Sequence, residues 1–114
     1  MAQSCLFCRI VRGELPGERL YEDDEVIIIR DIAPAAPQHL LVIPRRHLGS
    51  LNEVGVEDEA LLGRMVLAAV RQARDQGLTM RGYRLVMNCG RDAGQGVEHL
   101  HLHLLGGRQL GPIA

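Results

Sequence analysis

The chain has 114 residues, 46% hydrophobic and 24% charged, a balance that predicts one globular domain over residues 1–114 and excludes a disordered chain. Thirteen Lys and Arg residues against fourteen Asp and Glu residues give a net charge of -1, and aromatic residues are only 3%, so we expect no nucleic-acid partner. No apolar run reaches the ~20 residues of a membrane span, and the N-terminus lacks the features of a signal peptide, so we expect no membrane partner and a cytoplasmic location.

The first half of the chain predicts a short helix followed by three strands. Ser4 can cap a helix that runs through Arg12, and Gly13 can end it. Residues 26–29 are β-branched throughout, which is typical of a buried strand. The strands expected in this half span residues 19–22, 26–29 and 39–43.

The second half predicts one long helix and two further strands. The helix begins near Glu57, where a run of acidic residues favours the positive N-terminal end, and Gly77 can close it. Strands are expected at residues 84–89 and 99–105, on either side of a glycine-rich loop at residues 90–96. Five strands with one long and one short helix predict an α+β fold, in which an antiparallel sheet carries its helices on one face.

Three histidines alternate with leucines in the last expected strand. Because strand side chains point to opposite faces with a period of two, His99, His101 and His103 should share one face, spaced about 7 Å apart. Each imidazole brings two nitrogens that need partners, so this is not an ordinary core. A solvated polar face and a three-histidine metal site both remain open on spacing alone. The neighbouring glycine loop can offer backbone amides to a phosphate, which favours phosphoryl transfer to an imidazole nucleophile.

The chain contains three cysteines, an odd number that argues against a secreted disulfide scaffold. Cys5 and Cys8 have the spacing of a zinc half-site or of a redox pair. A thioredoxin-like pair is disfavoured because no βαβ unit surrounds the two cysteines. Cys89 lies in an apolar run and is expected to be a small buried residue.

These motifs together resemble the histidine-triad superfamily. Residues 99–105 read His-Leu-His-Leu-His-Leu-Leu, the signature of that superfamily, in which histidines alternate with apolar residues. Residues 31–44, Gly94-Gln95 and residues 105–109 resemble the Hint branch, the purine nucleoside phosphoramidases. The resemblance covers nearly the whole chain. It implies a five-stranded antiparallel sheet with two helices, paired into a homodimer that forms one continuous sheet.

The resemblance also implies an activity and a set of site residues. The activity is hydrolysis of the P–N bond of adenosine 5′-monophosphoramidate and related purine nucleotides through a nucleotidyl-histidine intermediate. His101 corresponds to the nucleophile, His103 to a residue that contacts the phosphate, and His39 to a histidine that supports the imidazole network, with His99 completing the catalytic set. The expected nucleotide contacts are Asp31 at the ribose hydroxyls, Asn88, Gly94, Gln95, Gly96 and Val97 around the phosphate, and Leu6, Phe7, Ile10 and Ile32 around the purine.

Some members of the superfamily carry a structural zinc ion, and the corresponding ligands here are Cys5, Cys8, His47 and His99. No organic cofactor is expected. Two other functions remain open: a dinucleoside polyphosphate hydrolase, and a nucleotide-binding or protein-interaction module whose hydrolysis is incidental. Gly106-Gly107 after the triad, in place of a Pro-Arg pair, favours the phosphoramidase over the polyphosphate hydrolase.

Overall fold

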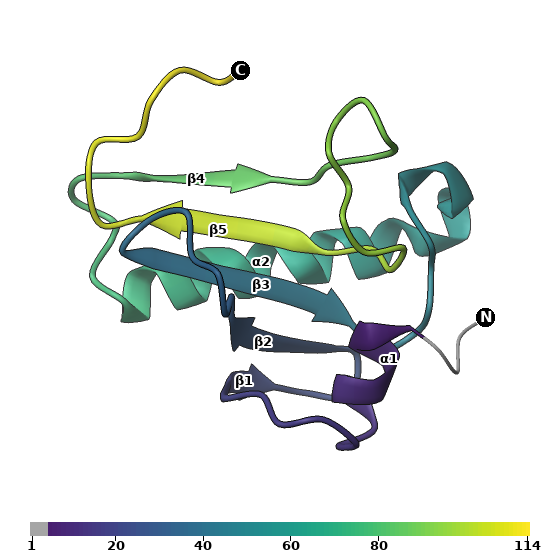
Figure 1. The fold of residues 1–114 in the computed structure, drawn as a ribbon. Helices are drawn as coiled ribbons and strands as arrows, with labels where there is room; N and C mark the ends of the chain where they lie inside the picture. The colour runs from purple at the N-terminus through teal and green to yellow at the C-terminus, as the bar shows by residue number, and fades with distance from the viewer. Residues whose placement is uncertain (1–4) are drawn as a thin grey trace.

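A computed structural model describes residues 5–114 and contains one antiparallel sheet of five strands in the order β1-β2-β3-β5-β4 (Figure 1). The predicted α+β fold, with one long and one short helix, is confirmed. The helices are α1 (Leu6–Val11) and α2 (Glu59–Asp75), and the strands are β1 (Arg19–Glu22), β2 (Val26–Arg30), β3 (Gln38–Pro44), β4 (Tyr83–Val86) and β5 (Leu102–Gly106).

The two central strands, β2 and β3, are buried on both faces. In β2, Val26 and Ile28 face one side while Ile27 and Ile29 face the other, and β3 alternates in the same way. One set joins a core under α2 that also contains Met65, and we call this the α2-side core. The other set joins a smaller core under α1, the α1-side core, made of Phe7, Ile10, Ile27, Ile29, Leu41 and Ile43.

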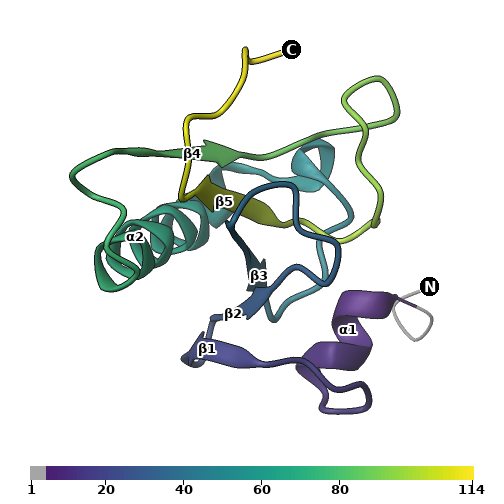
Figure 2. The ribbon, with the colours of Figure 1, turned by 60° about the vertical axis from the view of Figure 1, so that its left-hand side comes forward.

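The helices therefore cover opposite faces of the sheet, and the expectation of helices on one face is wrong. Figure 2 shows α2 on one side of the strands and α1 on the other. The physical reason lies in the central strands, which are apolar at nearly every position and so present hydrophobic surface on both faces. The short helix shields the second face with Phe7 and Ile10.

Helix α1 is capped by one of the two N-terminal cysteines. The Cys5 thiol accepts a hydrogen bond from the Cys8 amide at 3.4 Å, in the position that Ser, Thr and Asp side chains normally take. The predicted cap, Ser4, lies outside the described residues. The helix ends one residue earlier than expected, with Arg12 as its C-cap. Gly13 follows with a φ of +78°, a conformation that glycine adopts without strain.

Helix α2 begins at Glu59, two residues later than expected, because residues 56–58 form a 3₁₀ turn. The buried Asp58 carboxylate ends that turn by accepting hydrogen bonds from the Gly55 amide and from Arg46. Gly77 closes the helix as predicted, with a φ of +74° and an amide that donates to the Arg74 carbonyl. Neither described helix has the length and hydropathy needed to cross a bilayer.

Strands β4 and β5 are shorter at the histidine end than the predicted ranges 84–89 and 99–105. The ladder between β3 and β5 stops at Leu102, and the ladder between β4 and β5 stops at His103. Before Leu102 the chain no longer pairs with β3 or β4, and the Leu100 amide donates instead to the Leu48 carbonyl at 2.6 Å. Residues 99–101 therefore lie outside the sheet ladder, so their backbone groups are available for other bonds.

We expect the α2-side core to dominate stability. Met65 is fully buried there, whereas Met80 is 96% exposed. Met65→Ala should lower the free energy of unfolding by about 2–5 kcal/mol, through lost burial and the cavity that it leaves. The same chemical change at Met80 should shift it by less than about 0.5 kcal/mol. Urea denaturation measures both, and equal effects would contradict this assignment of the core.

Candidate active site and metal centre

Four of the predicted residues form one compact group, the Cys-His cluster of Cys5, Cys8, His47 and His99. Nδ1 of His99 lies 3.3 Å from the Cys5 sulfur, 3.5 Å from the Cys8 sulfur and 3.1 Å from Nδ1 of His47. The Cys8 sulfur is also 3.3 Å from Nδ1 of His47. The structure thus brings together residues from α1, from the loop after β3 and from the segment before β5.

The protonation of His99 is set by its second ring nitrogen. Nε2 lies 2.8 Å from the Pro44 carbonyl oxygen, which can only accept, so Nε2 carries the proton and donates it. Nδ1 therefore presents a lone pair to the two sulfurs and to His47. Burial lowers the pKa of His99, which favours this neutral form.

The four atoms have the spacing that a tetrahedral metal requires. Zinc bonds of about 2.3 Å to sulfur and about 2.05 Å to nitrogen separate a sulfur–nitrogen pair by about 3.6 Å and a nitrogen–nitrogen pair by about 3.3 Å. The separations in the cluster are 3.3–3.5 Å and 3.1 Å, and all four ligand atoms lie within 4.8 Å of one another. The donor set and its geometry fit a closed zinc site. The Pro44 carbonyl orients one of the two imidazoles, that of His99, through its second ring nitrogen.

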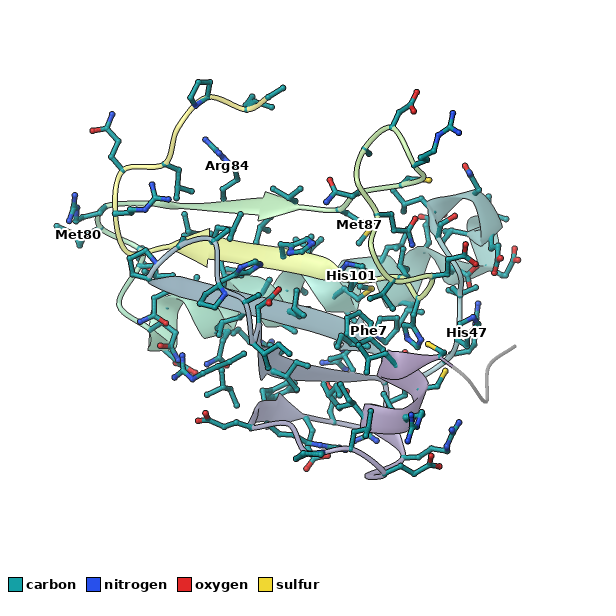
Figure 3. All side chains as sticks on the ribbon, in the orientation of Figure 1. Phe7, His47, Met80, Arg84, Met87 and His101 are labelled. Atoms are coloured by element: carbon teal, nitrogen blue, oxygen red, sulfur yellow. The ribbon has the colours of Figure 1, made fainter. Side chains whose placement is uncertain are left out.

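His101 lies next to this cluster with one nitrogen committed to the backbone. Its Nδ1 is 2.7 Å from the His99 carbonyl oxygen. Because a carbonyl cannot donate, Nδ1 carries the proton and Nε2 keeps its lone pair. The ring is buried and lies edge-on to Phe7 of α1, with the two ring centroids 5.1 Å apart (Figure 3). The predicted alternation holds, because the intervening leucines point into the α2-side core.

His39 and His103 form a second hydrogen-bonded pair with a defined direction. The Ala35 amide donates to Nδ1 of His39 at 2.9 Å, so the proton of His39 is on Nε2. That Nε2 lies 2.9 Å from Nδ1 of His103 and donates to it, which leaves the proton of His103 on its own Nε2. The ring centroids of His103 and His101 are 5.0 Å apart. The ring next to His101 therefore carries a hydrogen-bond donor on Nε2.

Both rings of this pair are neutral near pH 7. Burial and the nearby rings of His101 and His39 together lower the pKa of His103 to about 4, against the opposing effect of the Asp31 carboxylate. Burial also lowers the pKa of His39, although the carboxylate of Asp31 opposes the shift. An Asp31 oxygen lies 3.4 Å from Nε2 of His39, and the other accepts the Ala33 amide at 2.8 Å. Asp31 thus stabilises its own loop and orients His39.

The glycine loop is held in place by Gln95. Its side-chain oxygen accepts the Gly90 amide at 3.0 Å, and its side-chain nitrogen donates to the carbonyls of Gly49 and Val97 at 2.7 and 2.9 Å. The Gln95 side chain therefore forms its hydrogen bonds within the protein, where it stabilises the loop. Its predicted contact with the nucleotide stays a prediction. Gly94 has a φ of +81°, which a side chain at this position would strain.

The other predicted contact residues are placed in different environments. Val97 packs against the α1-side core. Asn88 follows β4, and Gly96 ends the glycine loop; neither residue forms a hydrogen bond to a histidine within the described residues. Phe7 and Ile10 are buried in that core, so they have the sheet-facing role of an amphipathic helix. Leu6 and Ile32 are exposed at 45% and 100%. Two of these four apolar residues therefore lie in the core, and the other two are open to solvent.

Sequence reasoning missed the backbone atoms that set the imidazole tautomers. The carbonyls of Pro44 and His99 and the amide of Ala35 cannot be recognised from residue types in the sequence.

Cys89 is partly exposed rather than buried as predicted, and it is a free thiol outside the Cys-His cluster. A cavity of about 450 Å³ beside Gly107 and Arg108 has none of the five histidines in its lining.

Comparison with known proteins identifies relatives over almost the whole chain. Residues 4–113 match the protein family described as scavenger mRNA decapping enzyme C-term binding. The purine nucleoside phosphoramidase of Escherichia coli strain K12 is 47% identical over 113 residues, which are 99% of this chain and 95% of that protein.

Solved structures agree with the sequence match. A HIT family hydrolase from Legionella pneumophila is 46% identical, with a TM-score of 0.93 over 95% of this chain and 96% of that chain. A zinc-bound histidine triad family protein from Mycobacterium smegmatis is 38% identical, with a TM-score of 0.80 over 95% of this chain and 78% of that chain. The alternating histidines, the fold and these matches show that the chain belongs to the histidine-triad family of hydrolases.

Proposed function

We propose that this protein hydrolyses the P–N bond of purine nucleoside phosphoramidates such as adenosine 5′-monophosphoramidate, through a nucleotide bound covalently to His101. The observation that carries the proposal is the bond from Nδ1–H of His101 to the His99 carbonyl, which leaves Nε2 unprotonated. A neutral imidazole with a fixed lone pair is a competent nucleophile near pH 7. The phosphoramidase of Escherichia coli, 47% identical to this chain, supports the choice of substrate.

The reaction consists of two displacements at phosphorus. In the first, Nε2 of His101 bonds to the α-phosphorus while the P–N bond to the leaving amine breaks, and the amine takes up a proton from solvent, which the attacking water of the second step returns. The ring then carries a positive charge, which the His99 carbonyl stabilises through Nδ1–H. In the second, water attacks phosphorus, the bond to Nε2 breaks, and the nucleoside monophosphate leaves with the imidazole neutral again.

The neighbouring groups can meet the charge that develops on the phosphate. His103 offers Nε2–H as a donor because His39 occupies its other nitrogen. We propose that Asn88 and the backbone of Gly94, Gly96 and Val97 supply the other contacts, in a loop that Gln95 braces. His99 acts through its carbonyl rather than through its ring, which belongs to the Cys-His cluster.

The nucleoside half of the substrate has fewer defined contacts. We propose that Asp31 accepts hydrogen bonds from the ribose hydroxyls, and that the exposed Leu6 and Ile32 pack on the purine once it is bound. Phe7 and Ile10 support this surface from the α1-side core. Apolar side chains form no hydrogen bonds with the polar groups on the edges of the base, so we expect only modest discrimination between adenine and guanine.

We further propose that Cys5, Cys8, His47 and His99 hold one zinc ion. Bound there, zinc would supply a cross-link between α1, the loop after β3 and the segment before β5, with no open position for substrate. The fit of the four ligand atoms and the zinc-bound relative of Mycobacterium smegmatis support this assignment. Thiolate ligands persist where cysteines stay reduced, so we place the protein in the cytoplasm.

We also propose a homodimer in which two sheets join into one. Strand β4 lies at an edge of the sheet, where its outer backbone groups lack a strand partner within the described chain. Val66 and Leu67 on α2 are 43% and 56% exposed, an apolar surface that a symmetric partner would cover.

Replacing the nucleophile tests the mechanism. His101→Asn should lower the rate on adenosine 5′-monophosphoramidate by about 10³-fold or more, as loss of a covalent nucleophile does. AMP affinity should change little, because the other phosphate contacts remain. Mass spectrometry of a quenched wild-type reaction should find a nucleotide on His101.

Two comparisons make that test specific. Asp31→Asn should mainly raise KM, because it alters a proposed ribose contact. Diadenosine polyphosphates assayed in parallel separate a phosphoramidase from a polyphosphate hydrolase, and nucleotide affinity without turnover would indicate a binding module. A His101→Asn protein with a rate near wild type would exclude the covalent mechanism.

Metal analysis tests the zinc assignment. Protein purified without added metal should contain about one zinc ion per chain, and Cys8→Ser should lose it, because a tetrahedral site with three ligands binds far more weakly. Cys89→Ser is the matched control, since that thiol lies outside the cluster, and it should keep the metal. Wild-type protein free of metal, or a Cys8→Ser protein with full occupancy, would refute the assignment.

Sedimentation tests the dimer. The chain mass is 12.6 kDa, so we expect a species of about 25 kDa at micromolar concentration. Leu67→Arg should shift the equilibrium toward monomer, because it places a charge on the surface proposed to be buried. Val56→Arg, at an exposed residue before α2, is the control and should leave the dimer intact. A wild-type species with the mass of one chain would contradict the proposal.

The low pKa of His103 predicts a pH dependence of stability. Between about pH 4 and about pH 6.5, the unfolded chain binds a proton on this ring and the folded chain does not, so stability falls as pH falls across this window. From neutral pH to about pH 4, the wild type should lose up to about 3 kcal/mol more than His103→Asn. Urea denaturation of both proteins measures the difference, and parallel curves would show that the pKa is not depressed.

A further inference from the structure

We propose that the Cys-His cluster is a positioning device for the nucleophile, so that metal occupancy of the cluster sets the rate at which His101 attacks phosphorus. This inference rests on the proposed role of His101. It goes further in assigning a catalytic effect to four residues that touch neither substrate nor reacting atoms.

The first connection is His99, which belongs to both sites. Its ring is fully buried, with Nδ1 in the cluster and Nε2–H bonded to the Pro44 carbonyl. Its own carbonyl accepts the proton of His101 at 2.7 Å. The residue that binds the metal therefore also fixes the tautomer of the nucleophile, and any movement of its backbone changes that bond.

The second connection is Phe7, which lies between the two cluster cysteines in the sequence. Its ring is edge-on to His99, at 5.9 Å between centroids, and edge-on to His101, at 5.1 Å. Figure 3 shows Phe7 between the segment that carries His101, just before β5, and the end of the molecule that carries His47. Phe7 thus limits the rotation of His101, and its own position depends on a helix that begins at a cluster ligand.

The third connection is in the backbone. The Leu100 amide donates to the Leu48 carbonyl at 2.6 Å, so the residue after one imidazole ligand is bonded to the residue after the other. The segments that carry His47 and His99 therefore move together. Because residues 99–101 lie outside the sheet ladder, this bond and the cluster help to hold their backbone in place, together with the buried Leu100 side chain and the bond from the His99 ring to Pro44.

A cation bound to all four ligands would fix this arrangement more firmly than hydrogen bonds do. Without it, Nδ1 of His47 and Nδ1 of His99 are 3.1 Å apart and are joined by a single hydrogen bond, which Nδ1–H of His47 donates to the lone pair of His99. Helix α1 has only six residues, too few to be stable through its own hydrogen bonds. We expect His99 and Phe7 to lose their fixed positions, and the proton of His101 to exchange between its two nitrogens.

The residues proposed to contact the phosphate and the ribose should be little affected. His39 and His103 are held by the Ala35 amide and by Asp31, which lie in the loop before β3 and make no contact with the cluster. The purine contact of Leu6 should weaken, because Leu6 belongs to α1. The proposal therefore predicts a separation: the rate of the first chemical step falls much further than nucleotide affinity does.

The test compares zinc-loaded protein with protein stripped by a chelator under reducing conditions. Three quantities are measured: the Kd of AMP by calorimetry, the single-turnover rate of nucleotidyl-histidine formation, and the ¹⁵N NMR signal of Nδ1–H of His101. We expect the Kd to rise by no more than about threefold, through the weakened purine contact, and the rate to fall about 10- to 100-fold, the usual cost of a misplaced catalytic group. The Nδ1–H signal should broaden or disappear.

A ligand variant and a stability control complete the design. His47→Gln weakens the cluster at a residue that does not touch His101, and added zinc should restore both the rate and the NMR signal. Met65→Ala lowers stability from the opposite face of the sheet, and it should leave the rate and the His101 signal unchanged. This pair separates positioning of the nucleophile from a general loss of stability.

The possible failures are distinguishable. Stripped protein with an unchanged rate and an unchanged His101 signal would overturn the positioning role and leave the proposed function intact. Stripped protein that unfolds completely would also overturn it, because the cluster would then hold the whole fold rather than His101. Zinc-loaded protein that forms no nucleotidyl-histidine would instead refute the proposed function, while the NMR signal would still report whether the cluster controls His101.

Discussion

The chemistry proposed for this protein depends on one hydrogen bond, from Nδ1–H of His101 to the carbonyl of His99. An imidazole has two nitrogens and, when neutral, one proton, so fixing the proton on one nitrogen defines the other as the nucleophile. The carbonyl is free to accept because its residue lies just beyond the end of the ladder that pairs β3 with β5. The place where the sheet stops therefore leaves the His99 carbonyl free to fix the tautomer of His101.

The other imidazoles follow the same logic with different partners. In His99 a carbonyl fixes the proton on Nε2 and leaves Nδ1 for the cluster, and in His39 an amide fixes the lone pair on Nδ1 and sends the proton toward His103. In His99, His101 and His39 a backbone group that can only donate or only accept decides the tautomer, and His39 in turn decides that of His103. The four histidines thereby differ in which nitrogen carries the proton, which suits the different roles proposed for them.

Period-two alternation was enough to predict much of this arrangement from the sequence. It placed three histidines on one face and their leucines in the core, and the apolar run at residues 26–29 correctly indicated a buried strand. It could not show that α1 lies across the sheet from α2, because a strand buried on both faces has no periodicity that assigns a helix to either side. Nor could it show that the Gln95 side chain is used within the loop, or that Ile32 is exposed, because both depend on the path of the backbone.

The two cores differ in what holds them, and the difference bears on how the molecule opens. The α2-side core is covered by a helix of 17 residues, whereas the α1-side core is covered by a helix of six residues. Segments with few buried contacts open at lower free energy than the rest of a fold. Amide protons of α1 should therefore exchange with solvent through a local opening that leaves β2, β3 and α2 folded. Such an opening would separate Phe7 and both cysteines from the histidines, so catalytic competence would be lost at a lower free energy than the sheet itself.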